Sequence, residues 1–210
     1  SQCADNGYTP FYGCVDKPNP NEGVECKPQC PIPASGSATV TSDCYLYNEI
    51  VVTGKLNVTG IPDAQGNLPK IIGGGSNRLF KVESGGELVV RSLNLTGGVR
   101  ETVPCENGNY NGCFGGIMYV TEHAVRFEAE TCVFHGGKAG YGGCIFVAGA
   151  TATIVSSTVV HCSASQYGGG VAFYPLGEKG SLKIIDSNVD GNNALYGGGV
   201  YVRKNDWTKY

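Results

Sequence analysis

The acidic residues of this sequence do not form a constellation that would catalyse a reaction. Roughly residues 38–202 repeat a pattern of strands and turns. The acids of this repeated region that lie near one another are Glu128, Glu130, Asp186 and Asp190, and none of them recurs in a neighbouring repeat. Polysaccharide cleavage by hydrolysis needs two carboxyl groups that face each other across the scissile bond. We therefore predict no catalytic residues.

Two histidines come closest to a metal site. His135 and His161 occupy the same position of the repeat, so they are expected to be neighbours on adjacent coils. Imidazole is a common metal ligand, but the same position holds Thr96 in the earlier copy and Asp190 in the later one. We predict a polar ladder at a turn, with no bound metal and no cofactor.

A column of aromatic residues is the remaining candidate site. Tyr141, Tyr167 and Tyr196 each precede a pair of glycines, and Phe114 holds the same place in an earlier copy. Equivalent residues of parallel strands lie about 4.8 Å apart, so these four rings are predicted to form a stacking ladder. Such a ladder can serve as a platform for sugars, but offset stacking more often stabilises the fold itself.

The ladder belongs to a repeat that organises the chain. An apolar residue comes seven positions before each tyrosine, and the copies start 26 and 29 residues apart. A repeat of this length, with strands, turns and glycine pairs, is typical of a solenoid. Each unit also holds apolar residues at alternate positions, as a strand with one buried face requires. The apolar residues before the tyrosines are Phe134, Val160 and Val189, and the aligned alternating pairs are Leu88/Val90, Phe127/Ala129, Thr153/Val155 and Leu182/Ile184.

The last copy resembles a known type of repeat. Asn192 comes three residues after Val189, and Tyr196 is followed by three glycines. This pattern resembles the Phe-x-x-Asn and Gly-Gly-Ala-Ile repeats of chlamydial polymorphic outer membrane proteins and of related secreted algal and bacterial proteins. The resemblance covers roughly residues 38–202. It implies an all-β fold, a right-handed parallel β-helix of about five or six coils. Since this fold hosts adhesins, lyases and structural proteins, the resemblance does not specify a function.

The cysteines indicate disulfides. There are ten of them, an even number, and they do not show the paired Cys-x-x-Cys spacing of zinc sites. Cys105 and Cys113 are predicted to close a short polar loop, and the other pairings stay open. The disulfide candidates are Cys3, Cys14, Cys26, Cys30, Cys44, Cys105, Cys113, Cys132, Cys144 and Cys162.

Two sequons point, like the predicted disulfides, to an oxidising compartment of the secretory route. Asn57 and Asn94 each lie between two apolar residues in an Asn-x-Thr sequence. If the apolar neighbours face inward, each asparagine faces solvent, where a glycan can be attached. We predict an N-glycosylated protein that is secreted, extracellular or at the cell surface.

Composition sets the domain organisation and excludes some partners. Residues 1–37 are a cysteine- and proline-rich N-terminal arm or cap, and residues 38–210 form the β-helix, with an insertion at 100–113 framed by cysteines.

The net charge of −3 and the lack of a basic stripe exclude nucleic acid as a partner. No run of about 18 apolar residues occurs, so no membrane span is expected.

These features favour a non-catalytic structural or adhesive glycoprotein, a subunit of an extracellular fibre, sheath or cell-surface appendage. A solenoid has two open ends with unpaired backbone groups. The last repeat strand, which ends at Val202, is followed by a short polar stretch without an amphipathic helix. We therefore expect head-to-tail assembly of the protein with itself, and glycans as further partners. The alternative is a polysaccharide-binding or polysaccharide-cleaving, lyase-like β-helix protein.

Overall fold

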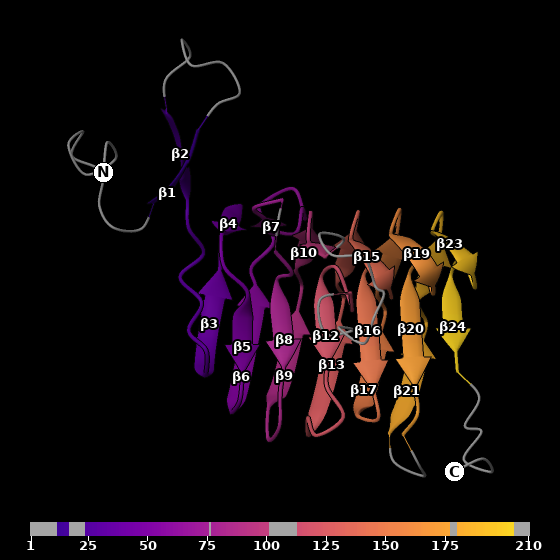
Figure 1. The fold of residues 1–210 in the computed structure, drawn as a ribbon. Coiled ribbons are helices and arrows are strands. Elements are labelled where there is room, and N and C mark those ends of the chain that lie inside the picture. Colours follow the sequence, from indigo (N-terminus) through magenta and orange to yellow (C-terminus); the bar gives the residue numbers. More distant parts are fainter. Residues whose placement is uncertain (1–11, 17–23, 76, 101–112, 177–179, 204–210) are drawn as a thin grey trace.

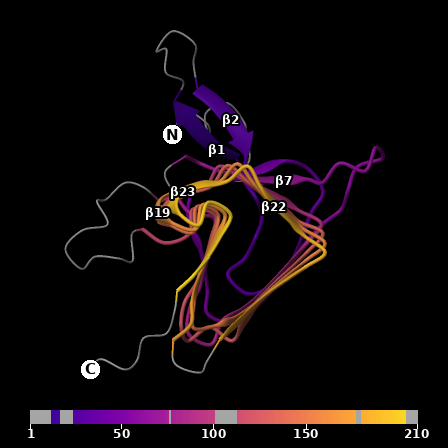
Figure 2. The ribbon, with the colours of Figure 1, turned by 90° about the vertical axis from the view of Figure 1, so that its right-hand side faces the viewer.

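The protein is an all-β, right-handed parallel β-helix, which confirms the predicted fold class. The computed structural model describes residues 12–16, 24–75, 77–100, 113–176 and 180–203, with side chains described from residue 27 onward. Six coils follow one another from the N-terminal to the C-terminal end (Figure 1). Seen from its C-terminal end, the chain turns counter-clockwise as it approaches the viewer, which makes the helix right-handed (Figure 2).

Four parallel sheets form the walls, and each contains the equivalent strands of successive coils. Sheet I contains β3 (Gly36–Val40), β6 (Lys55–Gly60), β9 (Glu87–Arg91), β13 (Arg126–Glu130), β17 (Thr151–Val155) and β21 (Ser181–Ile185). Sheet II contains β4 (Cys44–Leu46), β7 (Lys70–Gly73), β10 (Asn94–Thr96), β14 (Val133–His135), β18 (Thr158–Val160) and β22 (Asn188–Asp190). Sheet III contains β11 (Val99–Arg100), β15 (Lys138–Tyr141), β19 (Ser163–Tyr167) and β23 (Asn193–Tyr196). Sheet IV contains β5 (Ile50–Val52), β8 (Phe80–Val82), β12 (Met118–Val120), β16 (Ile145–Ala148), β20 (Val171–Tyr174) and β24 (Val200–Val202).

An antiparallel hairpin precedes the helix. β1 (Tyr12–Asp16) pairs with β2 (Val24–Pro28). In both views the hairpin stands outside the stack of coils, beside its N-terminal end (Figures 1 and 2). The hairpin therefore does not continue the solenoid.

The residues after the hairpin contact the first coil. Gln29 forms a parallel bridge with Tyr45, and the backbone N–H of Cys30 donates to the carbonyl of Tyr45 at 3.0 Å. A disulfide joins Cys30 to Cys44, and Ile32 packs against the core. This segment thus covers the sheet II side of the first coil.

The core is a column of apolar side chains that stack from coil to coil. In sheet I, Leu56, Leu88, Phe127 and Ala152 occupy equivalent inward positions, and all four are fully buried. Each inward residue contacts the residues above and below it, so burial of apolar area is shared along the whole helix.

The predicted alignment is wrong by one residue in the fifth coil. Ile154 pairs with Ile184 and points inward, whereas the sequence alignment placed Val155 there. Likewise Val159, rather than Val160, takes the inward position in β18.

A β-bulge in β19 causes this error. Ala139 pairs with Ala164 and Tyr141 with Tyr167, so two residues separate the pair in β19 where only one separates it in β15. An alignment that starts from Tyr167 and runs backward therefore places every upstream residue of that coil one position off. Because side chains alternate between faces, a shift of one residue exchanges the inward and outward sets.

Two disulfides join described residues, one at the first coil and one between the fourth and fifth coils. Besides Cys30–Cys44, a disulfide joins Cys144 to Cys162 across two coils. Cys113 is also disulfide-bonded. Among the other candidates, the following lie outside the described residues or side chains: Cys3, Cys14, Cys26 and Cys105.

Cys132 was a disulfide candidate, and this prediction is wrong, because its thiol is free and buried. The Sγ–H donates to the carbonyl oxygens of Glu130 at 3.3 Å and Val90 at 3.6 Å. Its neighbours in the stack of coils are Leu93 and Ser157, neither of which can form a disulfide. Burial raises the pKa of the Cys132 thiol to about 11, so the thiol stays protonated at neutral pH.

Glycine pairs allow sheets III and IV to meet at a sharp corner. A Cβ atom at Gly143 would lie 2.2 Å from the carbonyl oxygen of Gly169 and 2.5 Å from that of Ser163. Both contacts are with backbone of the next coil, which cannot move without disturbing its own hydrogen bonds. By contrast, a Cβ atom at Gly54 would meet only the Cβ of Ser35, at 3.7 Å.

The variant Gly143→Ala is therefore expected to destabilise the protein by about 2 kcal/mol or more, since two coils must separate to admit a methyl group. Gly54→Ala is the matched control and should change stability by less than about 0.5 kcal/mol. Urea unfolding followed by circular dichroism measures both. Equal stabilities of the two variants would contradict the close packing at this corner.

Candidate functional site, an aromatic groove between sheets III and IV

The four predicted ladder residues form one wall of a groove on the outer surface. The ring centroids of Tyr141 and Tyr167 are 5.5 Å apart with planes at 23°, and those of Tyr167 and Tyr196 are 5.1 Å apart at 19°. Phe114 meets Tyr141 edge-on at 5.4 Å. Because the tyrosine faces cover one another, this wall presents mainly ring edges and hydroxyl groups to the groove.

The second wall comes from the outward side of sheet IV and was missed in the sequence. Tyr119, Phe146, Ala172 and Tyr201 occupy equivalent positions of four successive strands. Each of them lies between two inward-facing apolar residues, so strict alternation already places its side chain outside. The alternation was therefore visible in the sequence. It was missed because each of these strands is a continuous run of apolar residues, and such a run is also typical of a strand buried on both faces.

Tyr174 joins the two walls. Ala172 leaves room in the second wall, and the Tyr174 ring lies beside this gap, 5.0 Å from Phe146 and 6.1 Å from Tyr201. The same ring meets Tyr141 of the first wall edge-on at 6.1 Å. Tyr174 therefore contacts both walls.

Rings also pack directly across the corner. Phe114 stacks on Phe146 with centroids 4.1 Å apart and planes at 8°, and Tyr167 lies 4.6 Å from Tyr201. Such pairs contribute about 0.5–1.5 kcal/mol each beyond their burial. The groove is consequently a preformed feature, held by the same contacts that line it.

Two hollows lie along this groove. One encloses about 460 Å³ and the other about 420 Å³, which is within the usual range of ligand sites. Phe114 and Tyr174 line both hollows, so the two adjoin. Since the walls extend over successive coils, the groove follows the axis of the β-helix, and it suits an elongated ligand.

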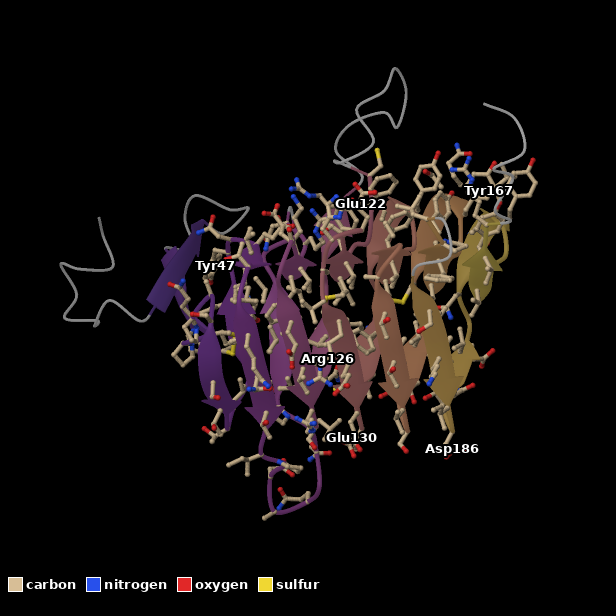
Figure 3. All side chains as sticks on the ribbon, turned by 90° about the horizontal axis from the view of Figure 1, so that it is seen from below. Tyr47, Glu122, Arg126, Glu130, Tyr167 and Asp186 are labelled. Atoms are coloured by element: carbon tan, nitrogen blue, oxygen red, sulfur yellow. A yellow bond between two sulfur atoms is a disulfide. The ribbon has the colours of Figure 1, made fainter. Side chains whose placement is uncertain are left out.

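Acidic groups line the end of the groove nearer the N-terminal coils. Glu83 is paired with Lys81 at 2.5 Å, and Glu122 with His123 at 3.3 Å. In Figure 3, Glu122 and Tyr167 lie along the same edge of the molecule. Glu83 thus has a cationic partner, and Glu122 has one when His123 is protonated.

A basic residue lines the other end. Arg203 follows β24 directly, and its guanidinium lies 5.3 Å from the centroid of the Tyr174 ring. The position of a cation over an aromatic face is favourable because the ring face is electron-rich. The exposed guanidinium can also donate hydrogen bonds to a ligand in the groove.

A buried arginine supports the walls from beneath. Arg78 is 1% exposed, its Nε donates to Glu49, and its Nη1 donates to the carbonyl of Phe114. Its guanidinium also lies 4.9 Å from the Tyr119 ring. Burial lowers the pKa of Arg78, and the Glu49 carboxylate opposes this shift. Arg78 therefore fixes one residue of each wall, a role that no sequence pattern indicated.

The predicted histidine pair does not line the groove. The rings of His135 and His161 are 5.3 Å apart. The two residues do not hold equivalent positions, as the sequence had predicted, because the bulge in β19 places Val160 opposite His135. Thr96 Oγ1 lies 3.3 Å from Nδ1 of His135. Within the described residues, no group of three His, Cys, Asp or Glu side chains could hold a metal ion.

Two acids of the repeated region, Glu128 and Glu130, have structural partners on sheet I. Glu128 is hydrogen-bonded to Arg126, and Glu130 to Arg91 at 2.9 Å. Asp186 occupies a turn with a φ of 47°. Arg126, Glu130 and Asp186 all lie away from the edge that carries Tyr167 (Figure 3).

Both sequon asparagines lie on outward faces. Asn57 and Asn94 are half-buried, while the apolar residues on either side of each are buried. Their orientation is that required for glycosylation, and the glycans themselves stay a prediction.

Comparison of the chain with protein-family models, curated proteins and solved structures finds no match. In the part of the chain that the structure describes, no helix is long and apolar enough to cross a membrane.

Tyr174 should make stability depend on alkaline pH. Burial, followed by the nearby phenols of Tyr141 and Tyr201, raises its pKa above the ordinary value of 10.0. The unfolded chain then ionises at a lower pH than the folded protein, so this contribution to stability is complete below about pH 10 and declines above it. Unfolding free energies between about pH 8 and pH 11 should fall more steeply for the wild type than for Tyr174→Phe. Parallel curves for the two proteins would refute this assignment.

Proposed function

We propose that this protein is a non-catalytic structural or adhesive glycoprotein of an extracellular fibre, sheath or cell surface, and that it holds a polysaccharide in its aromatic groove. The observation that carries the proposal is the pair of aromatic walls facing two adjoining hollows of about 460 and 420 Å³. The disulfides support an oxidising compartment. The resemblance of the repeat to those of polymorphic outer membrane proteins supports a cell-surface role.

The groove matches the chemistry of a sugar chain. Sugar rings combine apolar C–H faces with hydroxyl edges, and an aromatic surface flanked by hydrogen-bonding groups complements both. Tyr174 and Tyr201 provide ring surface, and Arg203 provides donors. Coils repeat about every 4.8 Å, so a linear chain of sugars along the axis would meet similar surroundings at successive units.

The arrangement of the acids supports binding without cleavage. Glu83 and Glu122 are the carboxylates of the groove; Glu83 forms an ion pair with Lys81, and Glu122 lies 3.3 Å from His123. Hydrolysis would require two carboxyl groups placed on opposite sides of one glycosidic bond. The engagement of Glu83 with Lys81 supports binding rather than cleavage.

The test is affinity electrophoresis of the full chain through gels that contain soluble neutral or acidic polysaccharides. At least one polysaccharide is expected to retard the protein, and Tyr174→Ala should weaken its binding by about tenfold or more, because removal of a central aromatic contact costs about 1.4 kcal/mol or more. Tyr47→Ala is the matched control. Tyr47 stacks with Tyr45 at 6.2 Å and does not line the groove, so this variant should bind normally.

The outcomes separate the alternatives. Absence of retardation by every polysaccharide, or equal loss of binding in both variants, would remove the groove as the site. Release of sugar fragments, with or without calcium, would instead establish the lyase-like alternative. Circular dichroism of each variant confirms that it is folded.

Head-to-tail assembly is a second proposed function, and the exposure of the last coil favours it. Val202 of β24 is 58% exposed, whereas the equivalent Phe173 and Val147 are 7% and 0% exposed. At the opposite end, β3 and β5 are the outermost strands of sheets I and IV. A second copy that places β3 and β5 of its first coil on this surface would extend sheets I and IV, and repetition of that contact gives a filament.

Light scattering of the full chain at high concentration tests this assembly. We expect large oligomers for the wild type and a monomer for the double variant Val200→Lys, Val202→Lys, since lysines would have to be buried in the joint. Val125→Lys is the control, because Val125 is 56% exposed on the side of the helix. A monomeric wild type, or assembly of the double variant, would exclude filament formation through the last coil.

A further inference from the structure

A pocket of about 590 Å³ lies on the outer face of sheet II, apart from the aromatic groove. Its lining includes Asn94, Lys70, Asp43, Ser42 and Ile61. One side is formed by the loop of residues 61–69, which leads into β7 and projects from the body of the helix (Figure 2). We call this hollow the Asn94 pocket.

The loop wall of the Asn94 pocket is held by its own hydrogen bonds. The carboxylate of Asp63 accepts from the backbone N–H of Gln65 at 2.9 Å, and from the backbone and side-chain N–H groups of Asn67 at 2.8 and 2.9 Å. At the base of the loop, the backbone N–H of Lys70 donates to Asp43 at 2.9 Å. The pocket is therefore preformed.

The Asn94 pocket combines an exposed apolar side chain with polar groups. Ile61 is 52% exposed, and Ser42, Asp43 and Lys70 line the same pocket. A molecule that has both an apolar face and hydrogen-bonding edges would cover Ile61 and pair with these polar groups.

Asn94 is itself the acceptor residue of a sequon, Asn94-Leu95-Thr96. We propose that Asn94 carries an N-linked glycan whose first sugar, an N-acetylglucosamine, is seated in the Asn94 pocket. This inference rests on the glycoprotein character proposed above. In the attachment, Asn94 Nδ2 loses one proton and forms a bond to C1 of the sugar, while the bond from C1 to the diphosphate of a lipid-linked donor breaks.

The chemistry of this sugar fits the pocket. Its apolar face covers Ile61, which is half-exposed. Its hydroxyl groups face a rim that contains the side chains of Thr41, Ser42 and Asp43. The glycan thus becomes part of the packing of the loop on sheet II.

The second sequon provides an internal comparison. Asn57 lies on the outer face of sheet I between Ser37 and Val89, and it lines none of the three hollows described above. A glycan at Asn57 would extend into solvent. The two sites should therefore differ in accessibility although they share one sequence motif.

The experiment uses the full chain secreted from a eukaryotic host. The native protein is treated with an amidase that cleaves the linkage at the asparagine, and the occupancy of each site is followed by peptide mass spectrometry. We expect release at Asn94 to be at least about tenfold slower than at Asn57, and the difference to vanish after denaturation. In Ile61→Ala, which removes the apolar side of the pocket, release at Asn94 should approach the rate at Asn57. Val125→Ala, on the side of the helix, should keep the difference.

A stability comparison supplies a second measurement. Thr96→Ala and Thr59→Ala each destroy one sequon and leave its asparagine in place. The loss of melting temperature caused by Thr96→Ala should be larger in glycosylated than in unglycosylated protein, whereas Thr59→Ala should show no such excess. Equal release rates at the two sites, or no excess for Thr96→Ala, would overturn the seated glycan while the glycoprotein character stands. Two unoccupied sites would overturn both.

Discussion

The fold depends on the vertical register between coils. Each strand is hydrogen-bonded to the same strand of the coils before and after it, so every residue lies directly over its equivalents. Apolar residues then meet apolar residues inside, as Leu88, Phe127 and Ala152 do, and rings meet rings outside, as Tyr141, Tyr167 and Tyr196 do. A side chain that suits one coil must therefore also suit its two neighbours, and this requirement explains why the sequence repeats at all.

The groove is a product of the same register at the corner between sheets III and IV. Paired glycines let the backbones of successive coils approach closely there, so the chain reverses within a few residues. The reversal turns two columns of outward side chains toward each other and converts two ordinary ladders into facing walls. Arg78 couples these walls to the interior through Glu49 and the carbonyl of Phe114. Binding surface and structural support are consequently made of the same rings, and a ligand would find them already in place.

The sequence was sufficient for the fold class and the first wall, because both follow from a repeat that can be counted directly. It was not sufficient where one coil contains an additional residue. The extra residue of β19 shifted Val155 and Val160 into inward positions that belong to Ile154 and Val159, since an alignment made backward from the tyrosines does not register an inserted residue. The second wall was missed for a different reason. Alternation shows on which side of its strand a residue lies. It does not show that the outward faces of sheets III and IV face each other, which depends on the sharp corner between these two sheets.

The two ends of the β-helix differ in a way that bears on how the chain acquires its structure. At the first coil, residues 29–32 and the Cys30–Cys44 disulfide make contacts that are local in sequence. Each later coil contacts only its neighbours, so it can add to a coil that has already formed. Folding that starts at the first coil can therefore advance one coil at a time toward β24, in the order in which the chain is synthesised. The local contacts at the first coil favour that direction.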